Sequence, residues 1–249
     1  MSFGVGLLSM VSLADPEAAI AAPPVACDGR THLAGRTPEF VRQLATHEVG
    51  HAAVARSFGT TVLRTTIEPT ESYAGRCFRV GAGVCHFDDH AAPADESLLS
   101  ICERLGSPLF GVSPIAEGEG RARALVACVE LVAGRTCERA MLGDAIEPLD
   151  ATLDYIEARA LARTLCQPSA VDALIAFAEQ EARAVIASNR DVVVALVDAL
   201  VGHGTLDAEQ IDATIIDAIA ARSARQESAR RVDWLRRIEG ARAFEEFCR

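Results

Sequence analysis

Apolar residues recur at helical spacing over most of the chain, and only one short stretch has the pattern of strands. The first firm helix is expected over 38–58, with Thr37 as N-cap, Pro38 at its first position and Gly59 at its end. Periodicity and capping residues predict further helices over 119–142, 150–165, 169–188, 191–201 and 208–221. The pattern therefore predicts a mainly α fold.

Two β-rich runs follow the first helix. Residues 61–68 are rich in β-branched side chains, and Pro69 ends this run. After a polar turn, residues 73–80 form the second run, and the two are expected to pair antiparallel. The expected fold is thus mainly α with a small antiparallel β element.

The same pattern divides the chain into three parts. Residues 1–36 form an irregular N-terminal segment, whose apolar run at 3–14 is too short to cross a bilayer. Residues 37–221 form the domain, in which 81–120 is expected to be a loop or insertion that covers a cleft. Residues 222–249 alternate Arg and Glu and are expected to form a charged helical tail that is solvated or faces a partner.

Composition narrows the class of protein. Half of the 249 residues are hydrophobic and only 5% are aromatic, which suits one large helix-rich domain. The net charge of -11 argues against a general nucleic-acid binder. Every basic residue is Arg, so the chain lacks the lysine that a P-loop ATPase needs, and no ATP is expected. The eight cysteines form no CxxC pair and indicate reduced thiols in a cytoplasmic protein.

The most specific motif is His47-Glu48-Val49-Gly50-His51, which has the form HExxH. On a helix the two histidines lie one turn apart on the same face, so both imidazoles reach one zinc ion. Glu48 lies close enough to take a proton from zinc-bound water. Small apolar neighbours indicate a packed helix. The motif predicts zinc-assisted hydrolysis, most often of peptide bonds, with Glu48 as the general base.

Catalytic zinc usually takes three protein ligands, so a third must come from elsewhere in the chain. Asp150 and Asp154 lie at the opening of a helix. The helix before them has small residues that would let other helices approach closely: Ala133, Gly134 and Ala140. Histidines elsewhere are further candidates: the pair His86 and His90, and the single residues His32 and His203.

Three blocks in order resemble the zinc-protease domain of the FtsH-type ATP-dependent proteases, peptidase family M41. They are HEVGHAAVARSFGTTVLRTTIEP from residue 47, ELVAGRTCERAMLG at 130–143, and ARAVIASNRDVVVALVDALVGHGTLDAEQI at 182–211. The resemblance covers about residues 38–215. It implies a helical zinc-metallopeptidase domain with Zn²⁺ as cofactor.

The resemblance also bears on the third ligand. In the family an Asp shortly after the AGR helix binds zinc, in a pattern like Asp-Leu-x-x-Ala. Asp154 is followed by Ala158, Leu161 and Ala162 at the family's offsets, so it is the expected ligand. Asp150 is the alternative, and is otherwise expected to be the N-cap.

The sequence departs from the family because the ATPase module and the transmembrane helices are missing, so no stable membrane span is expected. Arg139 also replaces the second acid of the pair that begins at Glu138. The expected function is an ATP-independent zinc metallopeptidase that hydrolyses peptides or unfolded proteins, with strand 73–80 pairing with an extended substrate. The alternative is a catalytically silent binding or regulatory protein that retains the fold. A homo-oligomer or a partner protein held through the C-terminal tail would suit either function.

Overall fold

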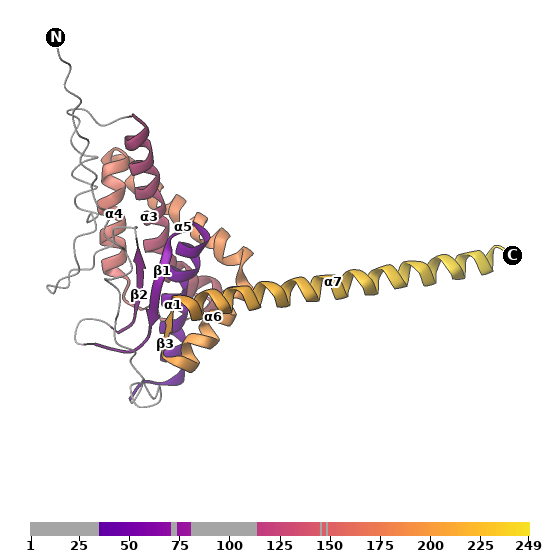
Figure 1. The fold of residues 1–249 in the computed structure, drawn as a ribbon. Coiled ribbons are helices and arrows are strands. Elements are labelled where there is room, and N and C mark those ends of the chain that lie inside the picture. Colours follow the sequence, from indigo (N-terminus) through magenta and orange to yellow (C-terminus); the bar gives the residue numbers. More distant parts are fainter. Residues whose placement is uncertain (1–34, 71–73, 81–113, 145, 148) are drawn as a thin grey trace, which may run out of the picture.

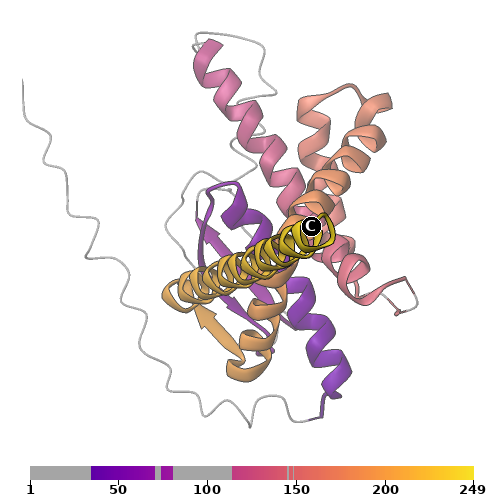
Figure 2. The same ribbon diagram turned by 90° about the vertical axis from the view of Figure 1, so that its right-hand side faces the viewer.

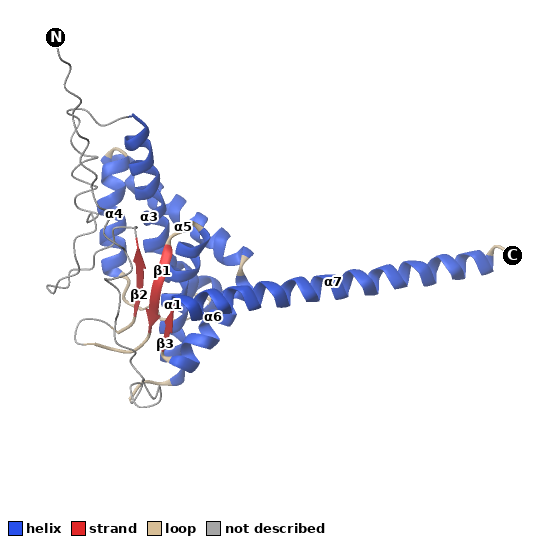
Figure 3. Cartoon of the chain, in the orientation of Figure 1, coloured by secondary structure: helices blue, strands red, loops and turns tan. Residues whose placement is uncertain are grey.

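A computed structural model describes residues 35–70, 74–80, 114–144, 146–147 and 149–249. In this part the chain is mainly α with a small antiparallel sheet, which confirms the predicted fold class (Figures 1 and 3). The N-terminal segment 1–34 and the expected cleft-covering stretch 81–113 lie outside the described residues. The elements are α1 (Pro38–Ser57), β1 (Thr61–Thr66), β2 (Arg76–Val80), α3 (Pro114–Leu142), α4 (Thr152–Leu165), the 3₁₀ turn η2 (Pro168–Ala170), α5 (Val171–Ser188), α6 (Arg190–His203), β3 (Thr205–Asp207) and α7 (Ala208–Phe247).

Helix α1 lies at the centre of the domain. It begins as predicted, with the Thr37 hydroxyl accepting a hydrogen bond from the Phe40 backbone N–H at 3.2 Å, and the chain leaves it at Gly59, whose φ is 81°. Every residue from 44 to 55 is buried, because α3, α5, α6 and the sheet all pack against this helix. The HExxH motif therefore lies in the core of the protein.

The sheet has the strand order β2-β1-β3, with antiparallel pairing throughout. Strand β3 extends the predicted pair on one side. It forms where the chain turns at Gly204, with a φ of 76°, and Leu206 comes opposite Thr65. On β2, which pairs with β1 alone among the described strands, Cys77 and Arg79 share the face that meets the helices, because side chains alternate along a strand.

Two predicted helix starts are wrong. Helix α3 begins at Pro114, so the last seven residues of the expected loop 81–120 are helical; the fixed φ of proline suits a first turn. Helix α4 begins at Thr152, and its N-cap is Ala151 rather than Asp150. Asp150 instead accepts a hydrogen bond from the Thr152 backbone N–H at 2.9 Å, which serves the same exposed helix end.

Helix α7 is one continuous helix, whereas the sequence pattern suggested a helix and a separate tail. It opens with a capping box between Asp207 and Gln210. Figure 1 shows it running far beyond the rest of the domain, and Figure 2 views it end-on. Its outer part carries pairs of opposite charge at i,i+4 spacing, such as Glu227 with Arg231, and these support a solvated helix. None of the described helices has both the length and the apolar character that crossing a membrane requires.

Candidate metal centre

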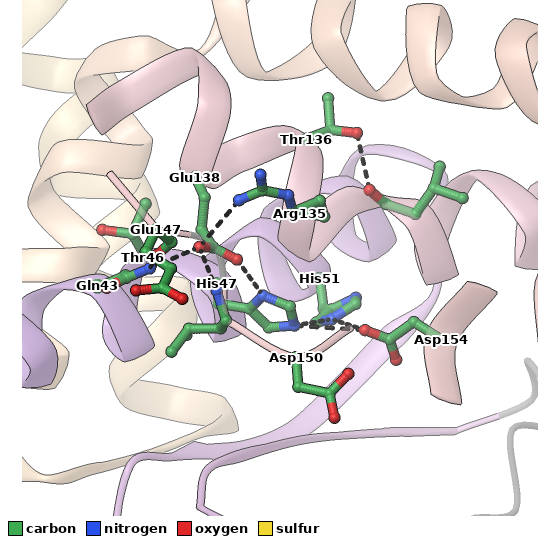
Figure 4. Close-up of polar contacts among 12 residues, drawn as sticks. Gln43, Thr46, His47, His51, Arg135, Thr136, Glu138, Glu147, Asp150 and Asp154 are labelled. Carbon is green, nitrogen blue, oxygen red and sulfur yellow. Dashed lines mark hydrogen bonds and ion pairs between the residues drawn. The ribbon is translucent and has the colours of Figure 1, made fainter. Parts of the chain in front are cut away.

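Three side chains from two helices meet at one point beside α1. The Nε2 atoms of His47 and His51 lie 3.2 Å apart. The Oδ2 atom of Asp154, from the first turn of α4, lies 3.3 Å from the first of these nitrogens and 3.5 Å from the second (Figure 4). Among the described residues, these three form a group with donor atoms close enough together to hold one metal ion.

The separations suit a tetrahedral zinc site. Zinc binds imidazole nitrogen and carboxylate oxygen at about 2.0–2.2 Å, so two donors on a tetrahedral ion lie about 3.4 Å apart. The three observed separations of 3.2, 3.3 and 3.5 Å match this value. Two imidazoles and one carboxylate also leave a fourth position for water or substrate.

The other ring nitrogens hold the two imidazoles in place. His51 donates from Nδ1 to the backbone carbonyl of Glu130 at 2.7 Å, which leaves the lone pair on Nε2. His47 Nδ1 lies 2.7 Å from the Glu138 carboxylate. Such outer partners orient metal-binding histidines and fix the ring nitrogen that faces the metal. Both Nε2 atoms are thus directed to the point where Asp154 arrives.

Glu138 is itself held by several donors. Its Oε2 accepts from the Gln43 side chain at 2.9 Å and from the Leu149 backbone N–H at 3.2 Å, and Arg135 lies 3.4 Å away. Burial would raise the pKa of this carboxyl, but the hydrogen bonds from His47, Gln43 and Leu149 outweigh it and lower the pKa. The lowered pKa favours the ionised carboxylate, which is a strong acceptor for an imidazole N–H.

Two glycines allow α1 and α3 to touch at this site. A Cβ atom on Gly134 would lie 2.5 Å from the Nε2 atoms of both histidines, and one on Gly50 would lie 2.6 Å from the Cβ of Cys137. No side chain fits at either position. The expectation that small residues of the helix predicted at 119–142 let other elements approach closely is confirmed at Gly134.

Glu48 lies beside this group in a cavity of about 680 Å³, whose wall includes β2 and the start of α4. Burial raises the pKa of its carboxyl, against the lowering effect of the two histidines. A Cβ atom on Gly75, just before β2, would lie 3.0 Å from Glu48 Oε1, so the glycine leaves room for the carboxylate. A raised pKa brings a carboxylate closer to the proton affinity that a general base needs at neutral pH.

A buried ion pair joins β2 to the helix behind His51. Arg79 lies 3.0 Å from Glu130 Oε2, and the two side chains are 5% and 0% exposed. The Thr60 hydroxyl donates to the other carboxylate oxygen at 2.6 Å. Glu130 thus contacts His51 through its backbone and the cavity-lining strand through its side chain.

Not every candidate ligand comes to this point. Asp150 is exposed at the edge of the cavity, and no contact joins it to either ring in Figure 4. His203 is exposed at the end of α6 and is not part of the group. His32, His86 and His90 lie outside the described residues.

The sequence interpretation missed Glu130, Arg79 and Glu157. A signal existed for the first, because Glu130 interrupts an apolar run in a helix that is otherwise buried on several faces. Arg79 shares its strand face with the buried Cys77, so it required a partner. Glu157 lines the cavity, and its buried Oε2 has no hydrogen-bond partner in the described structure. Burial and the negative charge of Asp154 raise its pKa.

The acids around the histidines favour a positive charge at the site. Burial alone would lower the pKa of His47, but hydrogen bonds to Asp154 and Glu138 and the charge of Glu48 raise it to about 10. The pKa of Asp154 is held well below its usual range, because the two histidines outweigh its burial. A proton and a metal cation therefore compete for the same ring.

Together these parts bring three donor atoms that could hold a metal ion next to a buried carboxylate and a cavity. Such an arrangement is suited to metal-assisted hydrolysis. The chain matches no model of a known protein family, and no curated protein matches it.

Proposed function

We propose that this chain is an ATP-independent zinc metallopeptidase with a fold like that of the FtsH-type M41 domain. The observation that carries the proposal is the triangle of donor atoms from His47, His51 and Asp154, with sides of 3.2, 3.3 and 3.5 Å. Two of these residues are a helical turn apart, and the third arrives from a segment about a hundred positions later. Such convergence on the spacing of a tetrahedral ion supports a metal site more strongly than the motif alone.

Zinc bound there would polarise a substrate carbonyl and lower the pKa of a coordinated water to about 7. The protein's own contribution is Glu48, which accepts the proton of the attacking water and then delivers it to the leaving amine. Its burial beside the histidines keeps bulk water from competing for that proton. Glu138 and the Glu130 carbonyl keep the imidazoles oriented throughout.

The substrate is an extended polypeptide. Strand β2 lines the cavity next to Glu48, so an extended segment that runs along this strand comes beside the proposed base. We expect this substrate to be a peptide or an already unfolded protein. We expect the protein in the cytoplasm, because its eight cysteines form no CxxC pair and suit reduced thiols.

The test compares wild type with Glu48→Gln on an unfolded casein-like substrate. Glu48→Gln keeps the zinc ligands but removes the base, so we expect normal zinc content and cleavage reduced by about 10²–10⁴-fold. Glu39→Gln is the matched control, since it makes the same change on an exposed residue of the same helix. Cleavage by Glu48→Gln at the wild-type rate would exclude this base.

The same experiment also tests the alternative function, a catalytically silent binding or regulatory protein. Wild-type protein that holds stoichiometric zinc but cleaves none of a varied set of unfolded substrates would favour a silent binding or regulatory protein. That result would leave the metal site intact and remove the hydrolase.

A further inference from the structure

The turn that carries Asp154 has little apolar anchorage. The buried side chains of α4 are Ala158, Leu161 and Ala162, all of which follow this turn. The neighbouring Leu153 and Ile156 are 68% and 57% exposed. Apolar packing therefore fixes the middle and end of α4, while its first turn needs another contact to hold the carboxylate beside the histidines.

Tyr155 supplies that contact. Its ring packs against the core, and its hydroxyl donates to Glu179 Oε1 on α5 at 2.5 Å. Arg139, from α3, lies 3.8 Å from the same oxygen. One residue after Asp154, the first turn of α4 is thus tied to both neighbouring helices.

We propose that Tyr155 is a positioning residue for the third metal ligand, acting through its hydrogen bond to Glu179. The inference depends on the proposed zinc site. Asp154 Oδ2 must remain at 3.3 and 3.5 Å from two nitrogens to complete the donor triangle. A hydrogen bond at the adjacent residue restricts the turn before the metal binds, so less conformational freedom is lost on binding.

A second polar link between α4 and α5 provides the comparison for a purely structural contact. Arg159 and Asp172 also join these helices, at 2.6 Å, but their side chains are 43% and 83% exposed. This pair lies beyond the turn that bears Asp154. Breaking it tests whether any polar link between the two helices affects the metal or only the one next to the ligand.

The experiment measures the zinc dissociation constant of the full chain by competition with a chromophoric chelator. Tyr155→Phe keeps the ring and removes the hydroxyl, and we expect about tenfold weaker zinc binding, as for other outer partners of metal ligands. Glu179→Ala should weaken binding similarly, whereas Glu179→Gln keeps an acceptor oxygen and should bind within about threefold of wild type. Arg159→Gln should match wild type, because an exposed pair contributes little.

Denaturant unfolding of the chelator-treated proteins shows whether each variant is folded and equally stable. Wild-type zinc affinity in both Tyr155→Phe and Glu179→Ala would overturn this inference and leave the proposed function untouched. Equal weakening by Arg159→Gln would also overturn it, since the effect would then be general to the helix pair. A wild-type protein that binds no zinc would overturn the proposed function and this inference together.

Discussion

Gly134 shows how one missing side chain makes room for the two imidazoles of the proposed metal site. It lies on α3 directly against the Nε2 atoms of His47 and His51, where a Cβ would come within 2.5 Å of each. Real Cβ atoms do not approach nitrogen so closely, so any other residue would displace the imidazoles or separate α1 from α3. The spacing of the two rings therefore depends on a residue that contributes no donor.

We expect Gly134→Ala to weaken zinc binding at least tenfold, because the rings must move away from their donor positions. Gly118→Ala is the control on the same helix, since a Cβ there meets nothing within 4 Å. It should leave zinc binding unchanged and stabilise the fold by about 0.5–1 kcal/mol, as alanine does in place of glycine in a helix. Unchanged zinc affinity in Gly134→Ala would show that the rings do not occupy the described positions.

His47 couples metal binding to protons. Its pKa is raised from 6.5 to about 10, so metal-depleted protein at about pH 8 keeps a proton on this ring, and zinc must displace it. We expect zinc binding at that pH to release about one proton, measured by calorimetry in buffers of different ionisation enthalpy. Binding heats that do not depend on the buffer would contradict this.

The same shift sets a pH dependence of stability in the metal-depleted protein. A raised folded-state pKa contributes stability that is fully present below the unfolded value of 6.5 and is lost as the pH rises toward about 10. Denaturant unfolding after chelation should therefore give a free energy of unfolding that falls across this window. His47→Gln, which removes the titrating ring, should flatten that fall.

At the scale of elements, α3 organises the site although it supplies none of the three proposed metal ligands. Along one helix it provides the carbonyl of Glu130 for His51, the space at Gly134 and the carboxylate of Glu138 for His47. The Glu130 side chain also reaches Arg79 on β2. The helix thus fixes the distance between the two histidines and the strand that lines the cavity.

The pair of Arg79 with Glu130 tests this link. Arg79→Met leaves a buried carboxylate without its charge partner, and we expect a loss of about 3–5 kcal/mol in the free energy of unfolding. The double variant Arg79→Met with Glu130→Leu should recover to within about 1 kcal/mol of wild type, since a packed apolar pair replaces a buried ion pair at little cost. Denaturant unfolding measures these differences. If Arg79→Met has the same free energy of unfolding as wild type, the Arg79 guanidinium is exposed to water rather than buried.

The helices and the histidine pair could be predicted from the sequence because both depend on the local order of residues. Thr37 and Pro38 begin α1, and i,i+4 spacing puts His47 and His51 on one face. The position of Asp154 beside them depends on tertiary packing. Before the structure, only the family resemblance gave a reason to prefer Asp154 over Asp150. The contacts of Glu130 depend on how α3, α1 and β2 pack together, and the spacing of residues along the chain does not predict this packing.

At the scale of the whole molecule, α7 divides into a docked beginning and a free end. Ile211 is its buried residue, and Arg222 and Arg225 bind Asp191 of α6. Residues 226–249 are exposed apart from the half-buried Ile238. The outer helix therefore adds little to the stability of the domain.

We expect deletion of 226–249 to change the free energy of unfolding by less than about 1 kcal/mol, because almost no apolar surface is uncovered. Deletion of 208–249 removes Ile211 as well, whose burial alone stabilises by about 1.5–3 kcal/mol. Denaturant unfolding compares the two. A large loss in the shorter deletion would mean that the outer helix packs against the protein or a second copy.

The zinc content of purified protein, measured together with that of Asp154→Asn and His51→Ala, tests the central claim most directly. The donor triangle predicts close to one zinc per chain in wild type and a strong loss in both variants, although the two residues come from different helices. Wild-type protein without a transition metal, or full zinc retention by Asp154→Asn, would contradict the account.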